Sequence, residues 1–380
     1  MNFDVNLNLS GERFSVVYSL QGTREDAYAQ AQDICVEQTI EFPADLVLQG
    51  DIRNHILGRI ESFTSIGSNR WEATISFAVE IVGDELTQLL NVLFGNFSLK
   101  PGVRLERFDL PDRMLTNFNG PRFGIRGLRE RIGVFSRPLF CTALKPMGLP
   151  VKDLAELAYQ FALGGVDMIK DDHGLADQPF HPFNERVEHC AQAVQEANAK
   201  TGGNCLYIPN LSAPVDRIRE KILFAKDKGV GGVMLAPGLV GLDMMRHIAE
   251  DNSLGLPVVG HPAFFGSFVT SPENGVSHHA IFGQLPRLCG ADAVVYPNYG
   301  GRFSFSRDDC RRIVEGLTAP MGNLEPVFSM PGGGMSIERI PDMLDVYGKD
   351  VIFLIGGALH KMGPDLVDNC KRYLEALYKP

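Results

Sequence analysis

The sequence has no stretch of about 18 consecutive apolar residues, so it contains no candidate for a transmembrane helix. Its first residues include no basic segment followed by an apolar run, which is the pattern of a secretory signal peptide. The seven cysteines show no paired spacing such as CxxC, and we interpret them as reduced, mostly buried thiols. These absences predict a cytoplasmic protein that does not bind membranes.

Positive charge is also scarce: the chain has 36 Lys and Arg residues and 46 Asp and Glu residues, which gives a formal net charge of −10. This excess disfavours nucleic acid or an anionic membrane as a partner, although a local basic pocket for an anionic metabolite stays compatible with it. Hydrophobic residues make up 44% of the 380-residue chain, which is enough for a large core. The length bounds the chain to one or two domains.

Residues 1–119 have the pattern of a small α+β domain, which we assign to the ferredoxin-like type. Strands are expected at 12–19, 51–64 and 70–82, where apolar residues alternate, and helices at 23–35 and 84–94, where they follow helical spacing.

From residue 138 onward, short apolar strands alternate with helix-like segments eight times. Such repeats over about 240 residues are typical of a TIM (β/α)8 barrel, whose active site lies at the carboxyl ends of the strands. We therefore expect a barrel domain at 120–380 and a packed junction near 118–124. The eight strands are expected at 138–144, 166–172, 205–210, 232–236, 257–261, 291–296, 326–330 and 351–355.

The most unusual segment is Lys170-Asp171-Asp172-His173, in which four ionisable residues follow one another at the end of a predicted buried strand. Unpaired charge is expensive where a strand end is desolvated, so a cation or a substrate must compensate it. The segment therefore predicts a metal site. The alternative is that Lys170 pairs with Asp171 or Asp172 as a structural ion bridge and that His173 only opens a loop.

Other polar residues also fall at the ends of the expected strands, among them Lys145, Asn210, His261 and Asn298. The seventh and eighth strands run into glycines. Because the loops after these two strands of a TIM barrel commonly hold a phosphate through backbone N–H groups, the glycines predict a phosphorylated substrate rather than ordinary tight turns. The two clusters are Gly332-Gly333-Gly334 and Gly356-Gly357.

The order and spacing of several motifs resemble the large subunit of ribulose bisphosphate carboxylase (RuBisCO), and the resemblance covers almost the whole chain. Departures from the motifs resemble its non-carboxylating relatives, the type IV RuBisCO-like proteins. The motifs are Gly120-Pro121-Arg122-Phe123-Gly124-Ile125, Arg137-Pro138-Leu139, Cys141-Thr142, Lys145-Pro146, Gly148-Leu149 and Gly164-Gly165-Val166-Asp167-Met168-Ile169-Lys170-Asp171-Asp172.

This resemblance implies that Lys170 takes up carbon dioxide as a carbamate, and that the carbamate, Asp172 and position 173 bind Mg²⁺. The family has a glutamate at position 173. Since imidazole suits magnesium less well than carboxylate does, His173 either acts on the substrate or binds another divalent ion. Lys145 matches the family lysine that moves protons at the enolisable carbon, His261 matches an active-site histidine, and Asn210 matches a polar position near the metal.

The resemblance also implies that one of the family's two phosphate sites survives, formed by Gly332, Gly333, Gly356 and Gly357. The contacts of the other site are lost. The second lysine of the family's KPKxGL motif is absent, and so is the arginine that follows the strand-five histidine, here His261. Val295 and Tyr296 stand where the family has a histidine and a serine, and Pro331 stands where it has another serine. The expected substrate carries one phosphate.

Two further positions depart from the carboxylase. Arg302 stands where the carboxylase has the lysine that positions carbon dioxide. Its planar guanidinium fits a carboxylate or phosphate of the substrate better than it fits carbon dioxide, so carboxylation is not expected. Glu37-Gln38-Thr39 resembles the segment that the small domain lends to the neighbouring subunit's site, which implies a homodimer with a shared active site.

These observations predict a metal-dependent, enolate-forming enzyme acting on a singly phosphorylated keto sugar or sugar acid. From sequence we favour a decarboxylase, transcarboxylase or hydrolase of 3-oxo-isoapionate 4-phosphate. One alternative is methionine salvage, as 2,3-diketo-5-methylthiopentyl-1-phosphate enolase or methylthioribulose-1-phosphate isomerase, with Phe264 and Phe265 lining a groove for the methylthio group. Another is a non-catalytic scaffold or stress-response protein.

Overall fold

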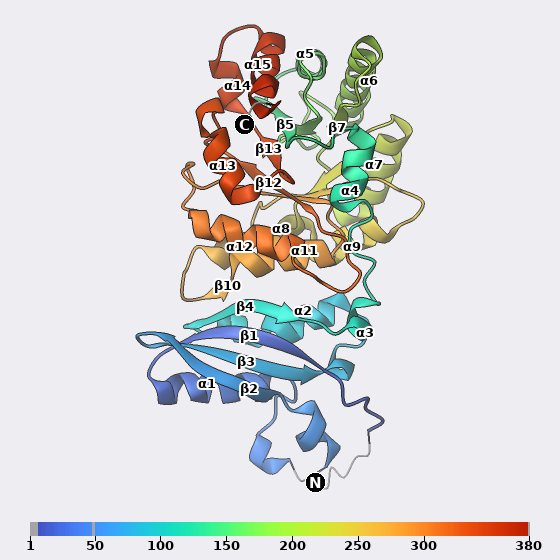
Figure 1. Cartoon of the computed structure of the whole chain (residues 1–380). Helices are drawn as coiled ribbons and strands as arrows, with labels where there is room; N and C mark the ends of the chain where they lie inside the picture. Colours follow the sequence, from blue (N-terminus) through green and yellow to red (C-terminus); the bar gives the residue numbers. More distant parts are fainter. Residues whose placement is uncertain (1–6, 48–49, 379–380) are drawn as a thin grey trace. The chain divides into compact units, whose positions relative to one another are not determined.

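The computed structural model describes residues 7–47 and 50–378, which form two compact units (Figure 1). Of these residues, unit 1 comprises 7–47 and 50–118 together with two later segments, Phe265–Gln284 and Met321–Asn323, and unit 2 holds the remainder. None of the helices in the described part of the chain is both long and apolar enough to cross a membrane.

Unit 1 is built on a five-stranded sheet in the order β10-β4-β1-β3-β2. The four longer strands pair antiparallel, and the short β10 pairs parallel with β4. Thr23 caps the start of helix α1, and its hydroxyl accepts a hydrogen bond from the N–H of Asp26. The elements are β1 Arg13–Gln21, α1 Arg24–Glu37, β2 Arg59–Gly67, β3 Arg70–Ala78, α2 Leu86–Phe94, β4 Val103–Asp109, α3 Asp112–Leu115, α10 Gly266–Val269 and β10 Gly275–Val276.

The β-α-β-β-α-β order of unit 1 confirms the predicted ferredoxin-like α+β fold and corrects two details. The strand expected from residue 51 begins only at Arg59, because Ile52–Ile56 form a short π-helix. Strand β4 was not predicted. Its register against β1 shifts between Val17 and Tyr18, so its buried side chains do not keep a spacing of two.

Unit 2 is a closed parallel barrel that confirms all eight predicted strands. Its sheet order is β7-β6-β5-β13-β12-β11-β9-β8, and a bridge between Asn210 and Met234 joins the two end strands. The strands are β5 Leu139–Leu144, β6 Met168–Asp171, β7 Leu206–Ile208, β8 Val233–Leu235, β9 Val258–Gly260, β11 Ala293–Pro297, β12 Phe328–Gly332 and β13 Ile352–Leu354.

Apolar side chains fill the barrel interior and helices surround the strands (Figure 1). Cys141, Met168, Met234 and Val259 belong to this interior cluster. The helices are α4 Gly124–Ile132, α5 Val151–Leu163, α6 Phe183–Thr201, α7 Val215–Asp227, α8 Pro237–Val240, α9 Leu242–Glu250, α11 Leu285–Leu288, α12 Arg307–Thr318, α13 Ile340–Tyr347, α14 Gly357–Lys361 and α15 Leu366–Tyr378.

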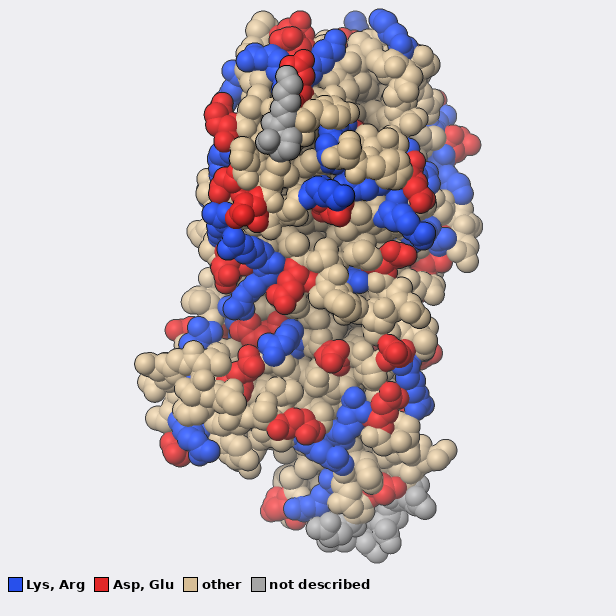
Figure 2. All heavy atoms as spheres, in the orientation of Figure 1, with Lys and Arg blue, Asp and Glu red and all other residues tan. Residues whose placement is uncertain are grey.

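On the face drawn in Figure 2, basic and acidic side chains lie interspersed. This face therefore has no continuous basic surface of the kind that binds nucleic acid.

A buried carboxylate, Asp292, ties the start of α4 to the amino-terminal end of the barrel. It lies just before β11 and accepts hydrogen bonds from the backbone N–H groups of Phe123, Gly124 and Val258, at 2.7, 2.8 and 2.9 Å. Burial raises the pKa of Asp292 to about 6, even though these three donors act to lower it. One side chain thus satisfies three backbone donors that would otherwise be buried without a partner.

We expect Asp292→Ala to lower the free energy of unfolding by about 3 kcal/mol or more, because each unsatisfied buried donor costs about 1–3 kcal/mol. Urea denaturation followed by circular dichroism measures the change. The control is Asp308→Ala on the exposed face of α12, which should leave stability nearly unchanged. A loss below 1 kcal/mol in Asp292→Ala would show that water replaces the carboxylate.

Candidate active site

The carboxyl ends of β5, β6 and β9 bring five predicted residues to the mouth of the barrel. Lys145 follows β5 and its Nζ lies 2.5 Å from Oδ2 of Asp172, which follows β6. His173 Nδ1 lies 2.9 Å from the other carboxylate oxygen of Asp172. The ring of His173 stacks on that of His261, with centroids 4.6 Å apart and planes 15° apart. Lys170, on β6, is 3% exposed beneath this layer.

Burial sets the protonation states of this cluster. It lowers the pKa of Lys170, which favours the neutral amine. Burial, reinforced by nearby Lys170 and His173, lowers the pKa of His261 to about 2, so this imidazole is neutral at physiological pH. Burial acts to raise the pKa of Asp172, but hydrogen bonds from His173 and Lys145 outweigh it and hold that pKa well below its usual range.

The carboxylate of Asp171 points away from the cluster, because successive side chains of a strand face opposite sides. It is fully buried and accepts hydrogen bonds from Arg186 on α6 and from the Tyr207 hydroxyl on β7. Lys170 Nζ donates to the backbone carbonyl of Asp171, not to its carboxylate. The ion bridge considered for Lys170 and Asp171 is therefore wrong, and Asp171 pairs with Arg186 instead.

Asn210 supports the loop after β6. Its side-chain amide donates to the backbone carbonyls of His173 and Leu175, at 3.0 Å each. Asn210 thus lies near the cluster, as expected, but its amide N–H groups bind the protein backbone.

The two glycine clusters follow neighbouring strands, since Gly332 of β12 lies in register with Leu354 of β13. Gly333 has a φ of +96°, and the space where its side chain would lie is open. A Cβ on Gly356 would lie 4.0 Å from Cε of Lys145. The second cluster therefore flanks the lysine at the mouth, with backbone that an anion can approach closely.

Two predicted residues lie outside this cluster. Arg302 is exposed on the loop after β11, and its guanidinium lies 5.0 Å from the ring centre of Phe303. Glu37 belongs to unit 1, where it ends α1 and accepts a hydrogen bond from Asn96 at 3.0 Å. Asn96 directly follows Phe94-Gly95, and its side chain fixes the carboxylate of Glu37 within unit 1.

Met147 is a residue that sequence reasoning missed. It lies on the loop after β5, is 52% exposed, and its methyl group would lie 2.8 Å from a Cβ on Gly174. The thioether therefore rests over the backbone next to His173, in the motif that lacks the family's second lysine. Phe264 is 72% exposed, whereas Phe265 is buried against Phe268 and Phe282 and cannot line an open groove.

The donors at the mouth fit a divalent ion when Lys170 carries a carbamate. Among the residues that the structure describes, no three His, Cys, Asp or Glu side chains gather as metal ligands. Asp172 provides carboxylate oxygens, His173 provides an imidazole whose Nδ1 hydrogen-bonds that carboxylate, and a carbamate on the buried Lys170 would add oxygen donors. Without the carbamate the site has too few oxygens for Mg²⁺.

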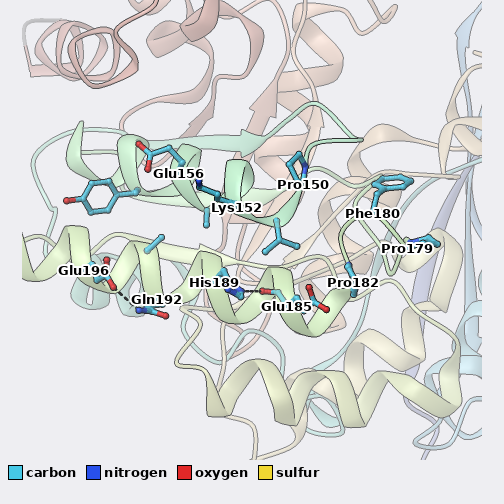
Figure 3. A pocket seen from close by; sticks show the side chains of 14 residues that line it. Pro150, Lys152, Glu156, Pro179, Phe180, Pro182, Glu185, His189, Gln192 and Glu196 are labelled. Carbon is cyan, nitrogen blue, oxygen red and sulfur yellow. Dashed lines mark hydrogen bonds between the residues drawn. The ribbon is translucent and has the colours of Figure 1, made fainter.

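A hollow of about 840 Å³ lies elsewhere, on the outside of the barrel between α5 and α6 (Figure 3). Glu156, Glu185 and Glu196 line it, with Lys152 as its one lysine. This lining repels a phosphorylated substrate, and none of the clustered ionisable residues reaches it. The barrel mouth is the better candidate for the active site.

Residues 124–365 match the family model of the ribulose bisphosphate carboxylase large chain, catalytic domain. The chain belongs to this family. It is 41% identical over 349 residues to 5-methylthioribulose-1-phosphate isomerase of Rhodospirillum rubrum, covering 92% of this chain and 91% of that protein. It is 31% identical to 2,3-diketo-5-methylthiopentyl-1-phosphate enolase of Bacillus licheniformis, covering 88% and 84%.

Solved structures agree with this assignment and with the RuBisCO fold. A Rubisco-like protein from Rhodopseudomonas palustris has a TM-score of 0.87 and 38% identity, covering 97% of this chain and 98% of that one. An octameric RuBisCO from Pyrococcus horikoshii has a TM-score of 0.89 and 27% identity, covering 99% and 89%. The protein is thus a RuBisCO-like member of a family that contains isomerases and enolases.

Proposed function

We propose that this protein is an enolate-forming isomerase of methionine salvage that acts on 5-methylthioribulose 1-phosphate. The observation that carries the proposal is Lys145, held at the mouth between the carboxylate of Asp172 and the backbone of Gly356. The two relatives of the protein named above act on substrates that carry a methylthio group and one phosphate. They support this alternative better than the decarboxylase of 3-oxo-isoapionate 4-phosphate that the sequence favoured.

Lys145 is the group that moves the proton. It must release its own proton and leave Asp172 before its amine can take a proton from the carbon beside the substrate carbonyl. The breaking C–H bond leaves its electron pair in an enediolate. The hydroxyl proton on that carbon then passes to the former carbonyl oxygen, and Lys145 delivers its proton to the former carbonyl carbon. A divalent ion held by carbamylated Lys170, Asp172 and His173 would polarise that carbonyl. Neutral His261 can hydrogen-bond a substrate oxygen without taking up a proton.

The substrate's two ends differ chemically, and so do the residues available for them. The glycine clusters offer backbone N–H groups for a single phosphate. At the positions of the lost phosphate contacts, Val295 and Tyr296 are buried in β11 and cannot replace them. Met147 provides an exposed apolar contact beside His173, which suits a methylthio group better than a second phosphate.

With Mg²⁺ and bicarbonate, we expect the protein to isomerise 5-methylthioribulose 1-phosphate and to exchange its transferred hydrogen with deuterium from D2O, as ¹H NMR would show. Lys145→Ala should reduce the rate by about 10²–10⁴-fold, the usual contribution of a general base. Lys152→Ala, an exposed lysine on α5, is the matched control. Release of carbon dioxide from 3-oxo-isoapionate 4-phosphate without isomerisation would instead support the decarboxylase.

We expect Met147→Lys to lower kcat/KM for 5-methylthioribulose 1-phosphate about 10-fold or more, because a methyl-sized apolar contact is worth about 1–3 kcal/mol. The same change should strengthen inhibition by ribulose 1,5-bisphosphate, whose second phosphate it would face. Met147→Leu keeps the apolar surface and serves as the control. Equal losses in the Lys and Leu variants would mean that Met147 contributes shape alone.

We further propose a homodimer in which Glu37 of one copy completes the site of the other. Large apolar side chains are exposed in the segments that follow barrel strands, and a second copy would cover them. They are Met147, Phe180, Leu239, Phe264 and Phe303.

A mixture of Glu37→Gln and Lys170→Ala subunits tests the shared site. Random exchange leaves one intact site in half of the dimers, so we expect about a quarter of the wild-type activity from two variants that are each inactive alone. Light scattering verifies the dimer, and a Glu37→Gln, Lys170→Ala double variant mixed with itself is the control. No recovery in a dimeric mixture would place each site within one chain.

A further inference from the structure

We propose that Arg186 is a positioning residue whose pair with Asp171 sets the places of Lys170, Asp172 and His173 at the mouth. The inference rests on the metal and carbamate site of the proposed function, but not on the identity of the substrate. Arg186 lies on α6 and has no contact with the predicted ligands themselves, so its effect passes through the backbone of β6 and the loop after it.

The guanidinium of Arg186 forms hydrogen bonds at three places along the end of β6 and the loop after it. Arg186 is 0% exposed, and its Nε donates to Oδ2 of Asp171 at 3.1 Å. Its Nη1 donates to the carbonyls of Ala176 and His181, at 2.7 and 3.0 Å. The strand end and the far part of the loop are therefore tied to the same side chain.

Asp171 and Asn210 hold the near part of the loop. Asp171 also accepts hydrogen bonds from the Tyr207 hydroxyl at 2.9 Å and from the backbone N–H of Asn210 at 3.0 Å. The Asn210 side chain in turn donates to the carbonyl of His173. The hydrogen bonds thus run from Arg186 through Asp171 and Asn210 to the residue predicted as the third ligand.

The alternation of side chains along β6 links the hydrogen bonds of Arg186 and Asp171 to the positions of the predicted metal ligands. Because side chains alternate, a strand that keeps Asp171 directed at Arg186 must direct Lys170 and Asp172 to the barrel mouth. A buried ion pair adds little net stability, since desolvation offsets most of its attraction, but removing one partner leaves a costly buried charge. The pair therefore penalises any other orientation of this strand end.

The chain contains a matched control at the other end of β6. Arg137 and Asp167 form a buried ion pair with two hydrogen bonds, at 2.6 and 2.9 Å. Both residues are at most 5% exposed, and Asp167 directly precedes β6. The two pairs have the same chemistry, but only Asp171–Arg186 adjoins the mouth.

The test compares Arg186→Met/Asp171→Asn with Arg137→Met/Asp167→Asn, which remove each charge pair without leaving a lone buried charge. Mn²⁺ binding in bicarbonate is measured by electron paramagnetic resonance, and the Lys170 carbamate by ¹³C NMR after labelling with ¹³CO2. We expect the Arg186 variant to bind Mn²⁺ about 10- to 100-fold more weakly, as for other residues that orient metal ligands, and to lose the carbamate signal. The Arg137 variant should bind within about threefold of wild type.

Equal Mn²⁺ binding by wild type and the Arg186 variant, or equal losses in both variants, would overturn the proposal. If the Arg186 variant does not fold, Tyr207→Phe removes one hydrogen bond to Asp171 without burying a charge, and unchanged Mn²⁺ binding there overturns it as well. A wild type that binds no Mn²⁺ would refute the metal chemistry of the proposed function and the positioning role with it. If wild type binds Mn²⁺ and the Arg186 or Tyr207 variant binds it equally well, only the positioning role would be refuted.

Discussion

Burial of a lysine at the mouth of a closed barrel is the constraint on which the site depends. Lys170 is almost fully buried because β6 pairs on both sides and the barrel closes between β7 and β8. A charged ammonium is costly there, so burial favours the neutral amine, which is the form that can react with carbon dioxide. The same closure brings His173 and His261 together from strands that are not neighbours in the sheet.

Much of this arrangement could be predicted from the sequence. The eight barrel strands are short apolar runs, and in a barrel the residue that ends such a run must lie at the mouth. That rule predicted that Lys145, Lys170, Asp172 and His261 lie at the carboxyl ends of their strands. It did not predict which groups each side chain contacts. The ferredoxin-like order was also predictable, except where the shifted register of β4 broke the alternation that identifies a strand.

What could not be predicted was the direction of polar side chains that bind other parts of the protein. Asn298 directly follows β11 as expected, but it is fully buried and its amide oxygen accepts a hydrogen bond from the Tyr347 hydroxyl. Arg186 lies in the apolar stripe of α6 between Phe183 and Cys190, where helical spacing alone suggests a core residue. A cation in such a stripe indicates a buried anion nearby, but spacing cannot identify that anion as Asp171.

The substitution of histidine at position 173 is compatible with this framework because the ring is held from two sides. Asp172 binds its Nδ1, and the ring of His261 stacks on its face. His261 is neutral, so the stack places no positive charge against the ring of His173. A glutamate in the same place would add a negative charge beside Asp172 and would need a cation to offset it, whereas the imidazole forms a hydrogen bond to that carboxylate without one. With histidine at position 173, the side chains at the mouth therefore keep their positions without a bound cation more readily than they would with glutamate.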